Sequence, residues 1–109
     1  MSILSKLRQT RQQILTQIGL IEEMRRGSVI RQFLKIRLKG QSKSTLVGPY
    51  ALFTLKKKGR TVSRRLRDLD EIRRLEQQVQ NYHTFQHLCR QLVEVGEALC
   101  EEKQKEERR

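Results

Sequence analysis

The sequence predicts an α+β fold, a long antiparallel helical hairpin with a three-stranded antiparallel β-meander between the helices, in the order α-β-β-β-α. Three observations predict it. Apolar residues recur at helical spacing near both ends of the 109-residue chain. Between these ends the apolar period shortens to two, which is typical of strands. Lys58 and Gly59 separate two such alternating stretches, and glycine supplies the positive φ that a two-residue hairpin turn requires.

The first helix is predicted over residues 2–26. Its apolar stripe follows one helix face and is formed chiefly by Leu4, Leu7, Ile14, Ile18 and Ile21. Ser2 is a good N-cap, because its hydroxyl can accept a hydrogen bond from a backbone N–H of the first turn. Gly27 is expected just past the last turn, where glycine adopts the left-handed backbone that often closes a helix.

Residues 28–39 are predicted to form the first strand, because apolar and cationic side chains alternate there. One face would pack against the helices and carries Ile30, Leu34, Ile36 and Leu38. The opposite face would be a row of cations around one aromatic ring, formed by Arg31, Phe33, Lys35, Arg37 and Lys39. Residues 40–48 have no strong periodicity and are predicted to form a loop.

Strands over residues 50–57 and 60–66 are predicted to form a hairpin that turns at Lys58 and Gly59. In this register one face carries Phe53, Leu55 and Val62, and the other carries Leu52, Thr54, Ser63 and Arg65. The tip is crowded by Lys56, Lys57, Lys58 and Arg60. Such a tip is better suited to contact a groove or a phosphate backbone than to pack in a core.

The second helix is predicted over residues 69–100, with Asp68 or Asp70 as its cap. The charged residues 101–109 are expected to form a C-terminal tail. Residues 1–100 would then be a single domain. Because two helices and three short strands make a thin core, we expect a second copy or a larger protein to bind along the long helices.

Charge is distributed unevenly along the chain, whose net charge is +12. Residues 1–67 hold 17 basic and 2 acidic side chains, whereas residues 68–109 hold 7 basic and 10 acidic ones. The 43 residues from Arg25 to Arg67 contain 14 Lys or Arg and no Asp or Glu. Because solvated faces normally mix both signs, this stretch favours a polyanionic partner, and nucleic acid first, over an acidic protein or a merely solubilising surface.

The candidate nucleic-acid contacts are the cations of this stretch and one aromatic ring. They are Arg25, Arg26, Arg31, Phe33, Lys35, Arg37, Lys39, Lys43, Lys56, Lys57, Lys58, Arg60, Arg64 and Arg65. Arg would bind phosphate through paired hydrogen bonds and Lys as a point charge. RNA is somewhat favoured over DNA, because a small basic sheet suits structured RNA and no helix has the pattern of a DNA recognition helix.

The sequence has no pattern that points to catalysis, so we expect that the protein is not an enzyme. It has no Gly-rich phosphate loop, and the basic stretch holds no carboxylate pair for a metal. His83 and His87 have the i, i+4 spacing of metal ligands, but no Glu follows His83 as in zinc proteases. We therefore expect no metal and no cofactor. Since neither a signal peptide nor a membrane span is recognisable, the protein is expected to be cytoplasmic and to make no membrane contact.

Four short motifs occur at residues 27–29 (GSV), 48–50 (GPY), 57–63 (KKGRTVS) and 81–85 (NYHTF). In this order they resemble motifs of a small bacterial domain of unknown function that is associated with transposon and insertion-sequence genes. The likeness covers roughly residues 14–100. Members of that family usually carry a cysteine cluster that resembles a zinc knuckle before the GPY motif, whereas residues 38–44 here contain no cysteine. The resemblance implies mobile-element biology and nucleic-acid handling, without implying an activity.

These observations predict a small non-catalytic nucleic-acid-binding accessory protein, a subunit of a mobile-element-related nucleoprotein complex that grips phosphates with its basic β-meander. The alternative is a protein-interaction module, an adaptor or an inhibitor, that docks the same basic sheet on an acidic protein surface. Binding to RNA and DNA at two salt concentrations separates the two hypotheses, because a polynucleotide ligand releases counterions when it binds.

Overall fold

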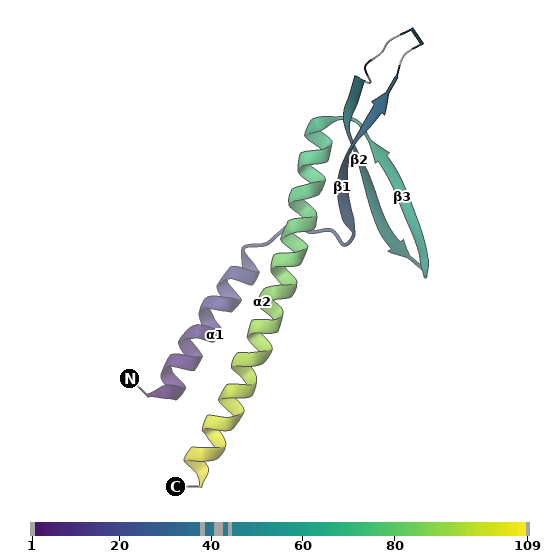
Figure 1. Ribbon diagram of the computed structural model, residues 1–109. Coiled ribbons are helices and arrows are strands. Elements are labelled where there is room, and N and C mark those ends of the chain that lie inside the picture. Colours follow the sequence, from purple (N-terminus) through teal and green to yellow (C-terminus); the bar gives the residue numbers. More distant parts are fainter. Residues whose placement is uncertain (1, 38, 41–42, 44, 109) are drawn as a thin grey trace. The chain divides into compact units, whose positions relative to one another are not determined.

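The computed structural model describes residues 2–37, 39–40, 43 and 45–108, and it gives the backbone alone for residues 34–36, 45–47 and 49. The elements of this described part are α1 (Ile3–Gly19), β1 (Ser28–Ile36), β2 (Thr45–Lys57), β3 (Arg60–Leu66) and α2 (Leu69–Glu107) (Figure 1). The predicted α+β order, α-β-β-β-α, is confirmed. Leu38, which was predicted to lie on the apolar face of the first strand, falls outside the described residues.

The chain divides into two compact units. The helical unit consists of Met1–Glu23 and Asn81–Arg109, and the sheet unit is Met24–Gln80. Helix α2 therefore contributes its first turns to the sheet unit and its remaining turns to the helical unit.

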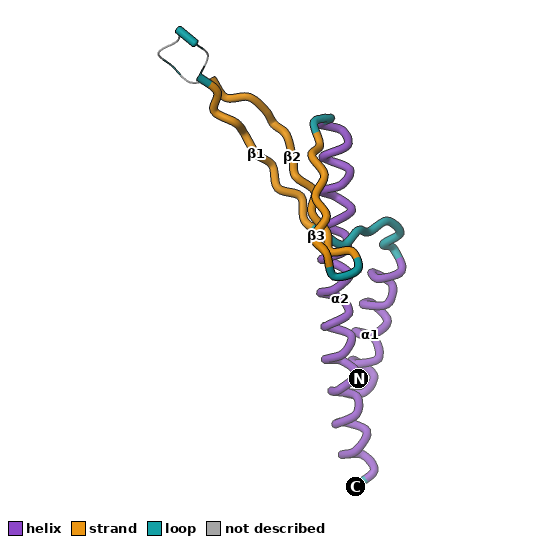
Figure 2. Tube along the Cα trace, turned by 90° about the vertical axis from the view of Figure 1, so that its right-hand side faces the viewer, coloured by secondary structure: helices purple, strands orange, loops and turns teal. Residues whose placement is uncertain are grey.

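In the helical unit, α1 runs antiparallel to the second part of α2, and the two lie side by side in both views (Figures 1 and 2). Ser2 caps α1 as predicted, since its Oγ accepts a hydrogen bond from the Ser5 backbone N–H at 3.1 Å. The buried apolar side chains described in this unit are Leu4, Ile14 and Leu88. Most other apolar side chains of the two helical stripes are only partly buried.

Helix α1 ends at Gly19, so the prediction of a helix over residues 2–26 is wrong at its C-terminal end. Gly27 does have positive φ, at 126°, but it closes no helix. It lies against β2, where a Cβ on Gly27 would come within 2.6 Å of the Thr54 carbonyl oxygen and 3.1 Å of the Phe53 ring. This close approach, rather than helix capping, requires glycine there.

The segment after α1 bonds to α2 instead of continuing as a helix. In the helical unit the Asn81 side-chain amide donates to the Glu23 carbonyl at 2.9 Å. In the sheet unit the Arg25 backbone N–H donates to the Gln78 carbonyl at 3.0 Å. A glycine costs about 1 kcal/mol relative to alanine inside a helix, and these hydrogen bonds replace those that further turns would make.

The sheet has the order β1-β2-β3 and is antiparallel throughout the described residues. The predicted hairpin register is confirmed, with Thr54 opposite Ser63 and Lys57 opposite Arg60. The turn residues Lys58 and Gly59 have φ values of 52° and 78°, which is the left-handed pair that a two-residue hairpin loop needs.

Strand β2 is longer than predicted, because it begins at Thr45 and not at residue 50, and β1 ends at Ile36 and not at residue 39. The pairing shifts by one residue between Gln32 and Leu34 of β1. At this bulge Gly48 has a φ of 149° and lies against Phe33, whose Cδ1 would be 3.1 Å from a Cβ on the glycine. The loop prediction for residues 40–48 is wrong for residues 45–48, which belong to β2. Gly48 and Pro49 indicate a break in the sequence, whereas a bulge lets the strand continue through them.

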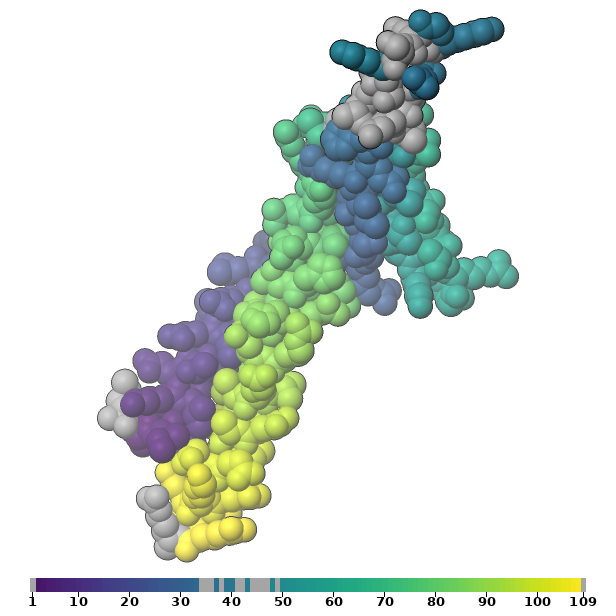
Figure 3. Space-filling view, viewed as in Figure 1, coloured from purple at the N-terminus to yellow at the C-terminus, as the bar shows by residue number. Residues whose placement is uncertain are grey.

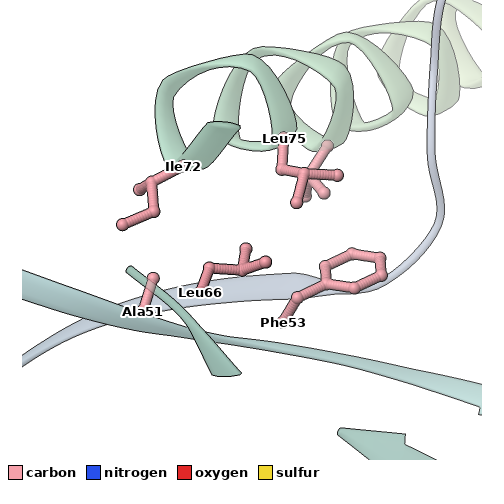
Figure 4. Packing of buried hydrophobic residues seen from close by; sticks show 6 residues of the cluster. Ala51, Phe53, Leu66, Ile72 and Leu75 are labelled. Carbon is pink, nitrogen blue, oxygen red and sulfur yellow. The ribbon is translucent and has the colours of Figure 1, made fainter. Parts of the chain in front are cut away.

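The core of the sheet unit lies between one face of the sheet and the first turns of α2 (Figure 4). Ile72, Leu75 and Val79 follow one helix face and bury themselves against Ala51, Phe53 and Leu66. Asp68 caps α2 as one of the two predicted candidates, since its Oδ1 accepts from the Asp70 backbone N–H at 3.0 Å. The helix then runs to Glu107, so residues 101–107 are helical and the predicted end at residue 100 is wrong. Their Glu, Lys and Gln residues are strong helix formers.

The first part of β1 has the opposite facing from the one predicted. Val29 packs against the core, whereas Ile30 is 53% exposed. The pairing puts Val29 opposite the buried Phe53 and Arg31 opposite the buried Ala51. Arg31 can lie on the face toward α2 because Glu76 of that helix pairs with it. The alternation of side chains along one strand cannot reveal such a partner.

Candidate nucleic-acid interface

The tip of the β2–β3 hairpin concentrates exposed positive charge. Lys56, Lys57, Lys58 and Arg60 are all exposed, and within the described part of the chain none of them forms an ion pair. Lys56 lies on the face that looks away from the core, while Lys57 and Arg60 alternate to the other face. In Figure 3 side chains of this hairpin, coloured teal, project outward at the right-hand edge. The tip therefore presents cations on both faces of a two-stranded ribbon.

Three other arginines predicted to bind nucleic acid are engaged within the sheet unit. Arg31 forms two hydrogen bonds with Glu76, from Nε to Oε2 at 2.8 Å and from Nη2 to Oε1 at 2.7 Å. Arg64 contacts Glu71 at 3.1 Å. These contacts connect the sheet to the first turns of α2, so both guanidinium groups have a carboxylate partner within the sheet unit.

Arg25 likewise binds α2, through a hydrogen bond of 2.7 Å from its Nε to the Gln78 side-chain oxygen. The hydrogen bonds from Arg31 hold the pKa of the Glu76 carboxyl below its ordinary value of 4.5, and in return the pKa of Arg31 is raised. Glu76 and Glu71 thus pair with arginines of the sheet, and among the described residues neither forms an ion pair with the hairpin tip.

An open groove of about 360 Å³ lies beside the hairpin within the sheet unit. It is lined by Arg26, Gly27, Ser28, Thr54, Leu55, Lys56 and Thr61. The lining thus combines two cations with three hydroxyl groups and contains no acid. Of these residues, sequence reasoning singled out Arg26 and Lys56 as contacts but missed the hydroxyls. The shared face of Thr54, Lys56 and Thr61 was implied by the hairpin register, because Thr54 lies two residues before Lys56 on β2 and Thr61 pairs with Lys56.

The outer face of the sheet also carries a stacked pair. The Arg65 guanidinium lies over the Tyr50 ring, 4.7 Å from its centroid. Beside this pair the Thr54 and Ser63 hydroxyls are 3.2 Å apart. Stacking fixes the Arg65 side chain against the sheet, yet the residue remains exposed. Tyr50 was not among the predicted contacts.

The remaining predicted contacts are not gathered with the hairpin tip. Phe33 is 59% exposed and lies at the bulge of β1. Arg37, Lys39 and Lys43 are exposed residues between β1 and β2. Lys35 belongs to β1, but its side chain is outside the described part. Arg31, which bonds to Glu76, therefore departs from the predicted row of cations around Phe33, and the row's other positions lie away from the hairpin tip.

Comparison with known proteins adds no family to this picture. The chain matches no protein-family model, no curated protein and no solved structure. The resemblance to a transposon-associated domain accordingly stays a prediction.

The described residues present neither a metal-binding cluster nor a membrane-spanning helix. No group of three or more His, Cys, Asp or Glu side chains in this part of the chain is arranged to hold a metal ion. Among the described helices, none combines the length and the apolar character needed to span a membrane.

Proposed function

We propose that this chain is a small, non-catalytic nucleic-acid-binding accessory protein that contacts the phosphate backbone with the tip of its β2–β3 hairpin. The observation that carries the proposal is the exposure of Lys56, Lys57, Lys58 and Arg60 without an ion-pair partner in the described residues. Four adjacent like charges repel one another, and a polyanion relieves that repulsion.

The hairpin chemistry favours backbone contact over the reading of adenine or cytosine edges. Residues 50–66 contain no Asn, Gln, Asp or Glu, which are the side chains that pair with adenine or cytosine edges in the major groove. Contacts from Lys and Arg to phosphates fix the position of a ligand without specifying its bases. We therefore expect broad specificity, and the preference for RNA over DNA stays a prediction to be tested.

The same proposal assigns the long helices to protein contact. In the described part of the helical unit few side chains are buried, and Val93 is 59% exposed on α2. A second copy or a larger protein would cover such surface, as expected for a subunit of a nucleoprotein complex. The mobile-element context rests on the sequence resemblance alone.

The direct test is a titration of the purified chain against labelled mixed-sequence RNA, single-stranded DNA and duplex DNA. We expect binding that weakens steeply between about 50 and 200 mM salt, because phosphate contacts release counterions. Absence of binding to all three ligands at the lower salt concentration would overturn the proposal. Binding instead to an acidic protein captured from the host, unaffected by nuclease treatment, would favour the adaptor or inhibitor hypothesis.

A further inference from the structure

The groove beside the hairpin arises where β2 extends past the beginning of β1. Pairing between these strands starts at Ser28 opposite Thr54, so residues 55–57 of β2 pair with β3 alone. The chain leaves the sheet at Gly27, which packs directly on the β2 backbone. Because Gly27 lies so close to β2, the preceding Arg26 lines the groove. Lys56 and Thr61 of the hairpin line it as well.

The polar groups of the groove match the needs of a phosphate. Phosphate oxygens accept hydrogen bonds and carry negative charge, so they require donors and cations. Arg26 and Lys56 supply the charge, and Ser28, Thr54 and Thr61 supply hydroxyl donors. The Thr54 hydroxyl lies 3.2 Å from the Ser63 hydroxyl. If it accepts the Ser63 hydrogen, its own hydrogen is available to a ligand.

The size of the groove favours a phosphate that is part of a larger molecule. Its volume of about 360 Å³ exceeds what one phosphate group fills, and it is open to solvent. A backbone phosphate with its neighbouring sugar would occupy more of this space, and the strand could continue toward the cationic tip, since Lys56 belongs to both places.

We propose that this groove is a phosphate-binding subsite, which holds one backbone phosphate of a nucleic-acid strand between Arg26 and Lys56. This inference rests on the proposed function and deepens it, because it names a defined position on the protein for one phosphate. The hairpin tip then binds the following phosphates of the same strand.

The test compares two groove variants with a charge-matched control. Arg26→Gln removes a groove cation, Thr61→Val removes a hydroxyl at nearly constant volume, and Arg67→Gln removes an exposed cation that does not line the groove. We expect RNA affinity to fall about tenfold or more for Arg26→Gln and about threefold for Thr61→Val, because a hydrogen bond from a charged donor contributes more than one from a neutral donor. Arg67→Gln should stay within about twofold of the wild type.

Nuclear magnetic resonance with inorganic phosphate separates this inference from the proposed function. We expect saturable shifts of the Gly27, Ser28 and Thr61 amide signals, which are lost in Arg26→Gln. If the wild type binds no nucleic acid but shows these shifts, the groove is a phosphate site for a small molecule, and the proposed function and the assignment to a strand both fail. If the wild type binds RNA while both groove variants behave like Arg67→Gln, the subsite is overturned and the proposed function stands.

Discussion

Replacing the four cations of the hairpin tip by Gln is expected to weaken RNA binding and to flatten its dependence on salt. The variant carries Lys56→Gln, Lys57→Gln, Lys58→Gln and Arg60→Gln. Each phosphate contact contributes about −0.7 for single strands and −0.9 for duplex DNA to the slope of log affinity against log salt, so four contacts contribute about −2.8 to −3.6. Over a fourfold rise in salt, the tip alone would therefore account for an affinity change of about 50- to 150-fold.

The assay is fluorescence anisotropy with a labelled oligonucleotide at several salt concentrations. Its control removes four exposed cations of the helical unit, with Arg8→Gln, Arg11→Gln, Lys103→Gln and Arg108→Gln. Both variants reduce the net charge from +12 to +8. If the control loses as much affinity and slope as the tip variant, general charge attraction explains binding and the assignment to the hairpin is refuted. An unchanged slope in the tip variant would refute it as well.

Two further predictions concern stability. Ile72→Ala removes a side chain with no exposed surface and is expected to lower the free energy of unfolding by about 2–5 kcal/mol in urea denaturation. Val93→Ala, at a site 59% exposed, should change it by less than about 0.5 kcal/mol, and equal effects would contradict the described core. Arg31 lowers the pKa of Glu76 in the folded chain, so the pair stabilises the fold at every pH above the ordinary carboxyl pKa of 4.5. This stabilisation is lost as the pH falls through the lowered pKa of Glu76. The melting temperature of Glu76→Gln should therefore lie below that of the wild type at neutral pH, and the two melting temperatures should converge in acid. A difference in melting temperature that does not change with pH would exclude this linkage.

The parts of the fold that local chemistry determines could be predicted from the sequence. Ser2 and Asp68 act as caps because their side chains satisfy N–H groups within two or three residues. The Lys58-Gly59 turn sets the hairpin register because both residues adopt positive φ. These features depend on neighbours in the sequence, and the α-β-β-β-α order followed from them and from the change in apolar period.

The sequence-based predictions were wrong where contacts with residues distant in the sequence determine the local structure. Apolar residues continue at helical spacing past Gly19, which predicts a longer helix. Glu23 and Arg25 instead form hydrogen bonds with residues of α2 that are more than fifty positions away in the sequence. The facing of Arg31 likewise depends on Glu76, 45 residues further along. For the site, the cationic tip was recognisable from its composition. The groove was not, because it forms where Gly27 approaches β2 in space.

The left-handed turn at the hairpin tip implies a trade-off between foldability and ligand contact. Lys58 has a φ of 52°, and a left-handed backbone costs a residue with a side chain roughly 1–2 kcal/mol compared with glycine. Asn or Gly at this position would close the hairpin more readily, but either would remove a positive charge from the most protruding point of the ribbon. An engineer who optimised this turn for thermal robustness would therefore select against binding, and the tolerance of position 58 to substitution should differ between a folding screen and a nucleic-acid-binding screen.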